Sequence, residues 1–145
     1  LLEGMEANIA ARLRTAAQLD DGLAGFPEVR IPSRLPNHRD TYQLYQVMVD
    51  DRDGLLAYLI SKDVEAKVHY PLPLHLQVAA ADLGYGKGSF PVCERQAGEI
   101  LTLPAHQYVA DNQVDYMVDC VRDFTAVSIK TGLGTILGVG LPMAI

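Results

Sequence analysis

The stretch Val68-His69-Tyr70-Pro71-Leu72-Pro73-Leu74-His75-Leu76-Gln77 holds two imidazoles, a phenol and a primary amide within nine residues, around two prolines. Each proline fixes its own φ and biases the residue before it towards an extended conformation. The stretch therefore predicts the end of a strand that runs into a rigid, non-helical loop. A preorganised polar loop on a small scaffold is a candidate ligand site. The alternative is a proline-rich crossover whose histidines cap neighbouring elements.

The residues before this loop predict a strand, a helix and a second strand. Thr41 to Val49 alternates aromatic, β-branched and polar residues, which is typical of a central strand. Asp51 is a candidate N-cap for a helix from about Arg52 to Lys62, whose apolar residues share one face. Ala66 to Tyr70 is the second predicted strand, a parallel partner or near neighbour of the first, with the helix on one face.

The residues after the loop predict two helices, a strand and a final helix. His75 to Leu83 is an Ala-rich helix candidate, and Ser89 is a candidate cap for the next helix, in which we expect Cys93 to be a core thiol. Leu101-Thr102-Leu103 is a short strand. A last helix is expected to begin at Asp111 and to pack on the core as far as about Phe124.

The N-terminal residues predict a helix that is already under way at Leu1. Apolar residues recur there every three to four positions, and no capping residue precedes them. The helix is expected to end near Ala24 with Gly25 as its C-cap, and to carry Arg12 and Arg14 on a solvated face. We therefore expect the chain to begin inside an element of a longer protein.

Composition and charge are those of an ordinary globular domain. The chain has 145 residues, 49% hydrophobic and 21% charged, which suits one domain with a modest core. A net charge of −6 with scattered basic residues argues against nucleic acid as a partner. Cys93 and Cys120 form no CxxC pattern, so neither a disulfide framework nor a zinc site is indicated, and reduced intracellular thiols are expected. No membrane association is expected, because no signal-peptide pattern is visible and the uncharged stretch 131–145 is shorter than the roughly 20 apolar residues of a membrane span.

Seven short motifs lie along the chain, and none is specific by itself. They are Tyr42-Gln43-Leu44-Tyr45, Asp51-Arg52-Asp53, His69 to Gln77, Leu83-Gly84-Tyr85, Ser89-Phe90-Pro91-Val92-Cys93-Glu94, Leu101-Thr102-Leu103-Pro104-Ala105-His106, and Gln113-Val114. In this order and at these spacings they resemble the C-terminal part of the DegT/DnrJ family. Members of that family are pyridoxal-phosphate-dependent aminotransferases that act on nucleotide-linked keto sugars.

The resemblance implies an α+β fold, in which helices pack on a small, mainly antiparallel sheet, as in the C-terminal domain of a fold-type I aminotransferase. It divides the chain into a bridging helix from an absent large domain at residues 1–25, a small domain at 26–125, and an apolar, Gly-rich tail of unknown role at 126–145. Asp63 stands where the family usually has glycine, so we expect left-handed backbone there. Gln107 and Ala110 replace the family's proline and threonine, so helix capping is expected to shift to Asp111.

The family's reaction needs a lysine that holds pyridoxal phosphate as a Schiff base. The chain's lysines are Lys62, Lys67, Lys87 and Lys130, and none lies in the Ser-x-x-x-x-Lys setting that the family places in its large domain. The resemblance therefore implies that the catalytic and cofactor-binding residues lie outside this chain, which is expected to be inactive alone.

The resemblance also implies that His69 and Tyr70 lie near a nucleotide-sugar substrate, with His75 and Gln77 beside them and His106 as a weaker candidate. The usual amino donor of the family is glutamate, and its members are cytoplasmic homodimers. Two alternatives stay open. One is the same domain from a related sugar dehydratase or regulator, in which the cofactor lysine is replaced. The other is a free-standing ligand-binding or oligomerisation module without catalysis.

Overall fold

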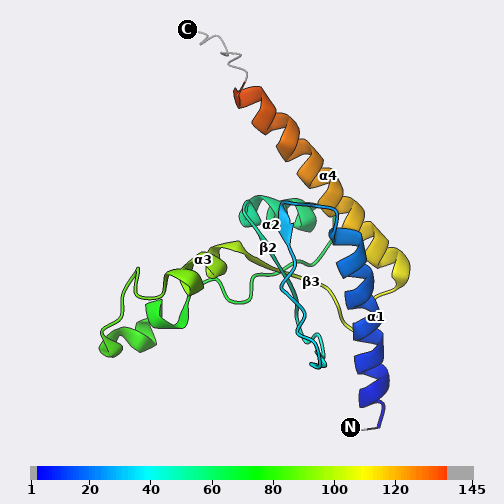
Figure 1. The fold of residues 1–145 in the computed structure, drawn as a ribbon, viewed down its shortest axis with the longest axis horizontal. Coiled ribbons are helices and arrows are strands. Elements are labelled where there is room, and N and C mark those ends of the chain that lie inside the picture. The colour runs from blue at the N-terminus through cyan, green and yellow to red at the C-terminus, as the bar shows by residue number, and fades with distance from the viewer. Residues whose placement is uncertain (1–2, 137–145) are drawn as a thin grey trace.

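A computed structural model describes residues 3–136 of the chain and, within its last helix, the side chains up to residue 127. A three-stranded antiparallel sheet packs against helices, and an arm, residues 71–90, extends away from them (Figure 1). This arrangement confirms the predicted α+β class. The elements are α1 (Met5–Leu23), β1 (Val29–Arg30), β2 (Tyr45–Val49), α2 (Arg52–Ser61), the 3-10 helices η1 (Leu74–Leu76) and η2 (Val78–Leu83), α3 (Pro91–Glu99), β3 (Ile100–Leu103) and α4 (Asp111–Ile136).

The sheet has the order β1-β2-β3, so the predicted central strand is central. The second predicted strand, Ala66 to Tyr70, is wrong in length, because only Lys67 forms a bridge, antiparallel to Thr102 of β3. The Lys67 N–H donates to the Thr102 carbonyl at 3.0 Å, and the Thr102 N–H donates to the Lys67 carbonyl at 2.7 Å. Pro71 and Pro73 carry no N–H, so the ladder cannot continue into the loop. The bridge therefore places this segment beside β3, and β3 separates it from β2.

One face of the sheet carries the hydrophobic core. Tyr45, Val47 and Val49 alternate along β2 with partly exposed residues, and Leu101 and Leu103 of β3 lie opposite the first two. This period of two is that of a strand with one buried face. The helices contribute fully buried residues to the same core, among them Leu19 and Leu23 of α1, Leu55 and Leu59 of α2, and Val114 and Val121 of α4.

A polar contact fixes α1 against β2. The Tyr45 hydroxyl donates to Asp20 Oδ1 at 2.7 Å, and Arg34 forms an ion pair with the same carboxylate at 2.7 Å. The Arg34 guanidinium also lies 5.5 Å from the centre of the Tyr45 ring. Burial, together with the hydrogen bond to Asp20, raises the pKa of Tyr45 above its ordinary value of 10.0. The contact sets where the rest of α1, including Arg12, lies relative to the sheet.

Three predictions about α1 have different outcomes. The helix ends at Leu23 with Ala24 as its C-cap in right-handed backbone, so Gly25 is not the predicted left-handed cap. Arg14 is exposed, as predicted. The prediction for Arg12 was wrong, because its side chain is half-buried against the segments before β2 and before α4.

The arm differs most from the expectations. An α-helix was predicted over His75 to Leu83, but the chain forms two 3-10 helices with no buried residue. Ser89 does not cap α3, because Phe90 is the N-cap and Ser89 Oγ accepts from the Gly86 N–H instead. Cys93 is exposed, so its prediction as a core thiol was wrong. The reason is that α3 leads out of the arm (Figure 1) and, in the part of the chain that the structure describes, has no buried residue.

The last helix is longer than expected. It begins at Asp111, as predicted, but continues past Phe124 to Ile136. Residues 137–145, the last nine residues of the 126–145 tail whose role the sequence left open, lie outside the described residues. Within residues 3–136 we find no helix with the length and apolar character to cross a membrane.

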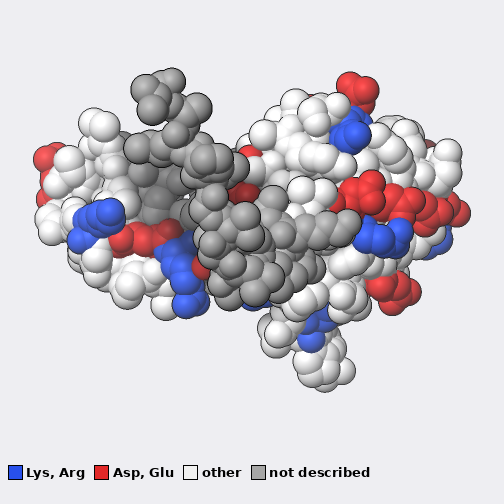
Figure 2. Space-filling view, turned by 90° about the horizontal axis from the view of Figure 1, so that it is seen from above, with Lys and Arg blue, Asp and Glu red and all other residues white. Residues whose placement is uncertain are grey.

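Acidic and basic side chains are mixed on the surface. On the face seen in Figure 2, Lys and Arg side chains lie beside Asp and Glu side chains. Ion pairs account for part of this mixing, such as Arg30 with Asp50 and Glu99, and Arg39 with Glu6. The expectation that nucleic acid is not a partner stays a prediction.

Candidate functional site

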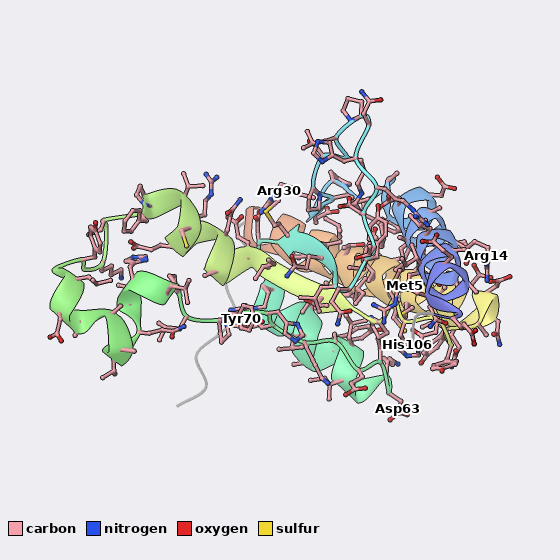
Figure 3. All side chains as sticks on the ribbon, turned by 90° about the horizontal axis from the view of Figure 1, so that it is seen from below. Met5, Arg14, Arg30, Asp63, Tyr70 and His106 are labelled. Atoms are coloured by element: carbon pink, nitrogen blue, oxygen red, sulfur yellow. The ribbon has the colours of Figure 1, made fainter. Side chains whose placement is uncertain are left out.

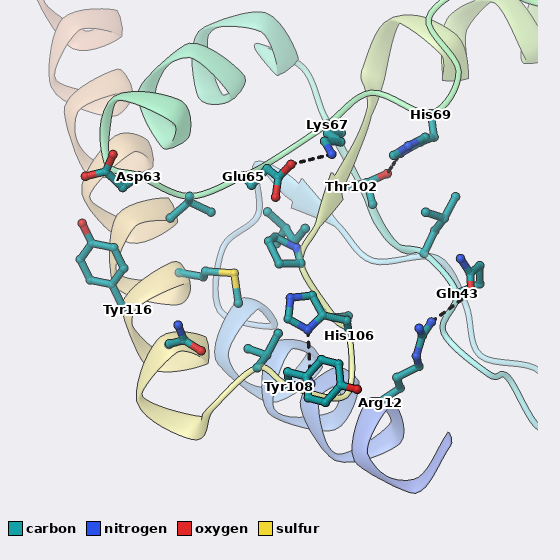
Figure 4. Close-up of a pocket in the computed structure, with 18 residues that line it drawn as sticks. Arg12, Gln43, Asp63, Glu65, Lys67, His69, Thr102, His106, Tyr108 and Tyr116 are labelled. Atoms are coloured by element: carbon teal, nitrogen blue, oxygen red, sulfur yellow. Dashed lines mark hydrogen bonds and ion pairs between the residues drawn. The ribbon is translucent and has the colours of Figure 1, made fainter. Parts of the chain in front are cut away.

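A pocket of about 480 Å³ opens beside β3, between α1 and the start of α4 (Figure 4). Its walls come from parts of the chain that are far apart in sequence: Arg12 of α1, Gln43 and Leu44 before β2, the segment from Asp63 to His69, and the segment from Thr102 to Met117. A pocket of this size and mixed polarity suits a small ligand.

Arg12 enters the pocket as a fixed guanidinium. Its Nε and Nη2 donate to Gln107 Oε1 at 3.3 and 3.2 Å, and its Nη1 donates to the Tyr42 carbonyl at 3.2 Å and to Gln43 Oε1 at 3.1 Å. These acceptors belong to two segments that are far apart in sequence, one before β2 and one before α4. A half-buried cation is thus held by neutral groups.

His69 and Lys67 reach the pocket because the bridge to Thr102 aligns their segment with β3. His69 Nδ1 lies 3.1 Å from Thr102 Oγ1, and the His69 carbonyl accepts from Gln46 Nε2 at 3.0 Å. The ring and the backbone of His69 are therefore both tied to the sheet, and Nε2 is the atom that a ligand can meet. Lys67 Nζ forms an ion pair with Glu65 at 2.6 Å, and this contact lowers the pKa of Glu65 below its ordinary value.

His106 lies on the opposite wall, after β3. Its Nδ1 accepts the backbone N–H of Tyr108 at 3.2 Å, so the neutral ring carries its hydrogen on Nε2. The Pro104 that ends β3 and the start of α4 at Asp111 confine this loop to the pocket rim. In Figure 4 the His106 ring lies between Arg12 and the Glu65–Lys67 pair.

The structure brings two of the candidate histidines together and leaves the other candidates apart. His69 and His106 line the pocket, whereas Tyr70, His75 and Gln77 do not. Tyr70 is 74% exposed, at the junction between the body and the arm (Figure 3), and follows His69 through a cis peptide bond. Gln77 lies in the arm, where its Nε2 donates to the Leu72 carbonyl at 3.4 Å. The assignment of His69, Tyr70, His75 and Gln77 to substrate stays a prediction.

Sequence reasoning missed Arg12, although a signal for it exists. Arg12 stands four, seven and eleven residues before Ala16, Leu19 and Leu23, three of the four buried residues of α1. Residues at these spacings share one helix face. Arg12 therefore continues the buried stripe of α1, while Arg14 lies off it.

The arm is held to the start of α3 by a partly buried contact between His75 and Glu94. His75 Nε2 lies 3.0 Å from Glu94 Oε1, and the His75 ring packs edge-on against Phe90 with centroids 4.8 Å apart. The Glu94 carboxylate also accepts the backbone N–H groups of Gly88, at 2.8 and 2.9 Å, and of Phe90, at 3.2 Å. The Gly88 bond is the main reason why the pKa of Glu94 lies below its ordinary value of 4.5. Here His75 has a structural partner.

Glu94→Gln is expected to loosen the arm and leave the core intact, because a neutral amide accepts weaker hydrogen bonds than a carboxylate. In the wild type the folded pKa of Glu94 is depressed, so its contribution is present above about pH 4.5 and is lost as the pH falls through the lower folded value. The hydrogen-exchange rates of the Gly88 and Phe90 backbone amides measure how far the arm loosens. Arg95→Gln, on the exposed side of α3, is the control. Equal protection of these amides in Glu94→Gln and in the wild type would contradict the role of the Glu94 carboxylate in holding the arm.

Comparisons with known proteins agree with this fold. The chain matches the DegT/DnrJ/EryC1/StrS aminotransferase family over residues 1–122. It is 34% identical over 113 residues to the erythromycin biosynthesis sensory transduction protein EryC1 of Saccharopolyspora erythraea, covering 78% of this chain and 31% of that protein. It is 35% identical over 112 residues to the UDP-2-acetamido-2-deoxy-3-oxo-D-glucuronate aminotransferase of Pseudomonas aeruginosa, covering 74% and 29%.

Solved structures also match this chain over part of their own length. The crystal structure of S. venezuelae DesV in complex with a ketimine intermediate matches with a TM-score of 0.82 and 30% identity, over 86% of this chain and 33% of that one. The chain thus spans about a third of the length of the relatives that it matches. Because the family match extends from the start of α1 into α4, this chain belongs to the DegT/DnrJ/EryC1/StrS aminotransferase family.

Proposed function

We propose that this chain is the small C-terminal domain of a longer enzyme, which uses pyridoxal phosphate to transfer an amino group from glutamate to a keto nucleotide sugar. The observation that carries the proposal is the family match over residues 1–122. Relatives named as transaminases of dTDP-linked and UDP-linked sugars support it. We further propose that the enzyme is a cytoplasmic homodimer, that residues 1–25 join the domain to the rest of the enzyme, and that residues 26–125 form the domain itself.

Pyridoxal phosphate, when bound, supplies the electron sink for transamination. The described lysine side chains do not fit it. Lys67 is 57% exposed and paired with Glu65, Lys62 lies exposed over the Tyr58 ring, and Lys87 is exposed in the arm. A lysine that forms a Schiff base is instead activated by a desolvated pocket or a neighbouring cation. We therefore propose that the attachment lysine lies in another part of the enzyme.

Among the candidate residues, His69 has the best-defined geometry for binding a nucleotide sugar. Such a substrate presents diphosphate oxygens and hydroxyl groups, which accept hydrogen bonds. When the Thr102 hydroxyl donates to His69 Nδ1, the neutral ring carries its hydrogen on Nε2 and donates from there. Tyr70, next in sequence and 74% exposed, offers a phenol to the same substrate. In this proposal the sheet orients the donors, and the chemistry takes place elsewhere.

In the full-length enzyme, His69→Ala is expected to raise the KM for the nucleotide sugar about tenfold or more, which corresponds to one lost hydrogen bond to a charged group. Thr102→Val keeps the shape of the side chain but removes the bond to Nδ1, so a smaller rise in the same KM is expected. Steady-state kinetics with both substrates measures the effect, and the KM for glutamate is expected to stay unchanged.

His38→Ala is the matched control, because it deletes the same side chain from an exposed turn. It is expected to leave both KM values at the wild-type level. If His69→Ala and His38→Ala behaved alike, His69 would have no part in substrate binding. If the full-length enzyme bound pyridoxal phosphate but did not aminate any keto nucleotide sugar, the proposed function itself would be wrong.

A further inference from the structure

The charge of Arg12 in the pocket has no acidic counterpart among the residues that the structure describes. Its acceptors are the Gln107 and Gln43 side-chain oxygens and the Tyr42 carbonyl, all neutral. The parts of the chain whose side chains are not described, residues 1–2 and 128–145, contain no Asp or Glu. A half-buried cation held only by neutral dipoles attracts an anion more strongly than one in an ion pair.

The guanidinium is also positioned before any ligand arrives. An arginine has five N–H donors, and the bonds to Gln107, Tyr42 and Gln43 use four of them. One hydrogen on Nη2 is left for a ligand, and the exposed Gln43 bond can be exchanged for another. The side chain therefore gives up little conformational freedom on binding, which favours affinity.

His106 adds a second donor at the same end of the pocket. Since its Nδ1 accepts the Tyr108 N–H, its Nε2 carries a hydrogen. The two carboxylates of the lining do not neutralise this end. Glu65 is paired with Lys67 at 2.6 Å, and Asp63 lies beside Tyr116 on the side of the pocket away from Arg12 (Figure 4).

We propose that the Arg12 end of this pocket is a binding site for a small oxyanion, a carboxylate or a phosphate group, held by the Arg12 guanidinium and by His106 Nε2–H. Gln107 is the positioning residue, because its carboxamide oxygen accepts from both Nε and Nη2 and keeps the guanidinium in the pocket without cancelling its charge. This proposal for an anion site is independent of the proposal that the full-length enzyme is an aminotransferase.

The test is an NMR titration of the 145-residue chain with inorganic phosphate and, separately, with glutarate, at ionic strength matched with chloride. The Arg12 Nε–H resonance and the backbone amides of Thr102 to Tyr108 report binding. Saturable shifts with at least one of the two anions are expected. Saturation by phosphate alone assigns the ligand to phosphate esters, and saturation by glutarate alone assigns it to carboxylates.

Three variants sharpen the test. Gln107→Glu keeps the size and the acceptor atom but supplies the missing negative charge, so anion binding is expected to weaken about tenfold or more. Arg12→Gln is expected to weaken anion binding by a similar factor. A well-dispersed NMR spectrum of each of these two variants shows that the variant is folded. Arg14→Gln removes the same charge from an exposed position of α1 and is expected to bind as the wild type does. The proposal is overturned if neither anion saturates, if Gln107→Glu binds as well as the wild type, or if Arg14→Gln weakens binding equally.

Discussion

Replacing Leu101 with alanine is expected to lower the free energy of unfolding by about 2–5 kcal/mol. Leu101 is fully buried in the middle of β3, directly opposite Val47 of β2, on the face where the helices pack. The substitution reduces the buried apolar area and leaves a cavity. The sheet and the helices that surround this cavity are closely packed, so they cannot easily move to fill it. Urea denaturation with a shared m-value measures the change.

Ile60→Ala is the control, because Ile60 is 56% exposed on α2. Its expected effect is within about 0.5 kcal/mol, which is usual for surface substitutions. If the two substitutions changed stability equally, Leu101 would not be buried in the core between β3 and the helices.

Gly22→Ala is expected to destabilise the chain by about 1–3 kcal/mol through overpacking. In most helix interiors the sign is opposite, since alanine is favoured over glycine by roughly 0.5–1 kcal/mol. At this position a Cβ would lie 2.6 Å from Val118 Cγ2 and 3.0 Å from Val118 Cγ1, on α4. Val118 is buried and β-branched, so it cannot easily turn away. Thermal unfolding measures the effect.

The paired substitution separates a clash from a general loss of helix stability. In the Gly22→Ala background, Val118→Ala is expected to restore part of the loss, with a coupling energy of about 1 kcal/mol or more in a double-mutant cycle. Gly98→Ala in α3 is the matched control, because its Cβ would meet nothing within 4 Å. A stabilising Gly22→Ala, similar to Gly98→Ala, would show that α1 and α4 do not approach each other here.

Features with a local cause could be predicted from the sequence. Asp51 caps α2, and its side chain accepts from the Gly54 N–H at 3.1 Å. Asp63 has a φ of 59°, as its replacement of glycine suggested. The alternation that predicted β2 reflects burial of every second residue. Each of these signals arises from a few neighbouring residues, so contacts with distant parts of the chain did not change the predicted local structure.

Features that depend on distant partners could not be predicted. The spacing in α3 suggested a buried face for Cys93, but periodicity does not say whether another element covers that face. The pocket depends on distant residues even more, because Arg12 donates to Gln107, which is 95 residues away in sequence. Of the candidate residues, only His69, beside the bridge to β3, and His106, in the loop after β3, line the pocket.

The central proposal is that this domain belongs to an aminotransferase whose cofactor lysine lies in another part of the enzyme. Peptide mapping of the full-length holoenzyme after borohydride reduction tests it most directly, because reduction fixes pyridoxal phosphate to the lysine that holds it. We predict one labelled lysine, N-terminal to Leu1. A label on Lys62, Lys67, Lys87 or Lys130 would contradict the account, and so would a protein that takes up no label at all.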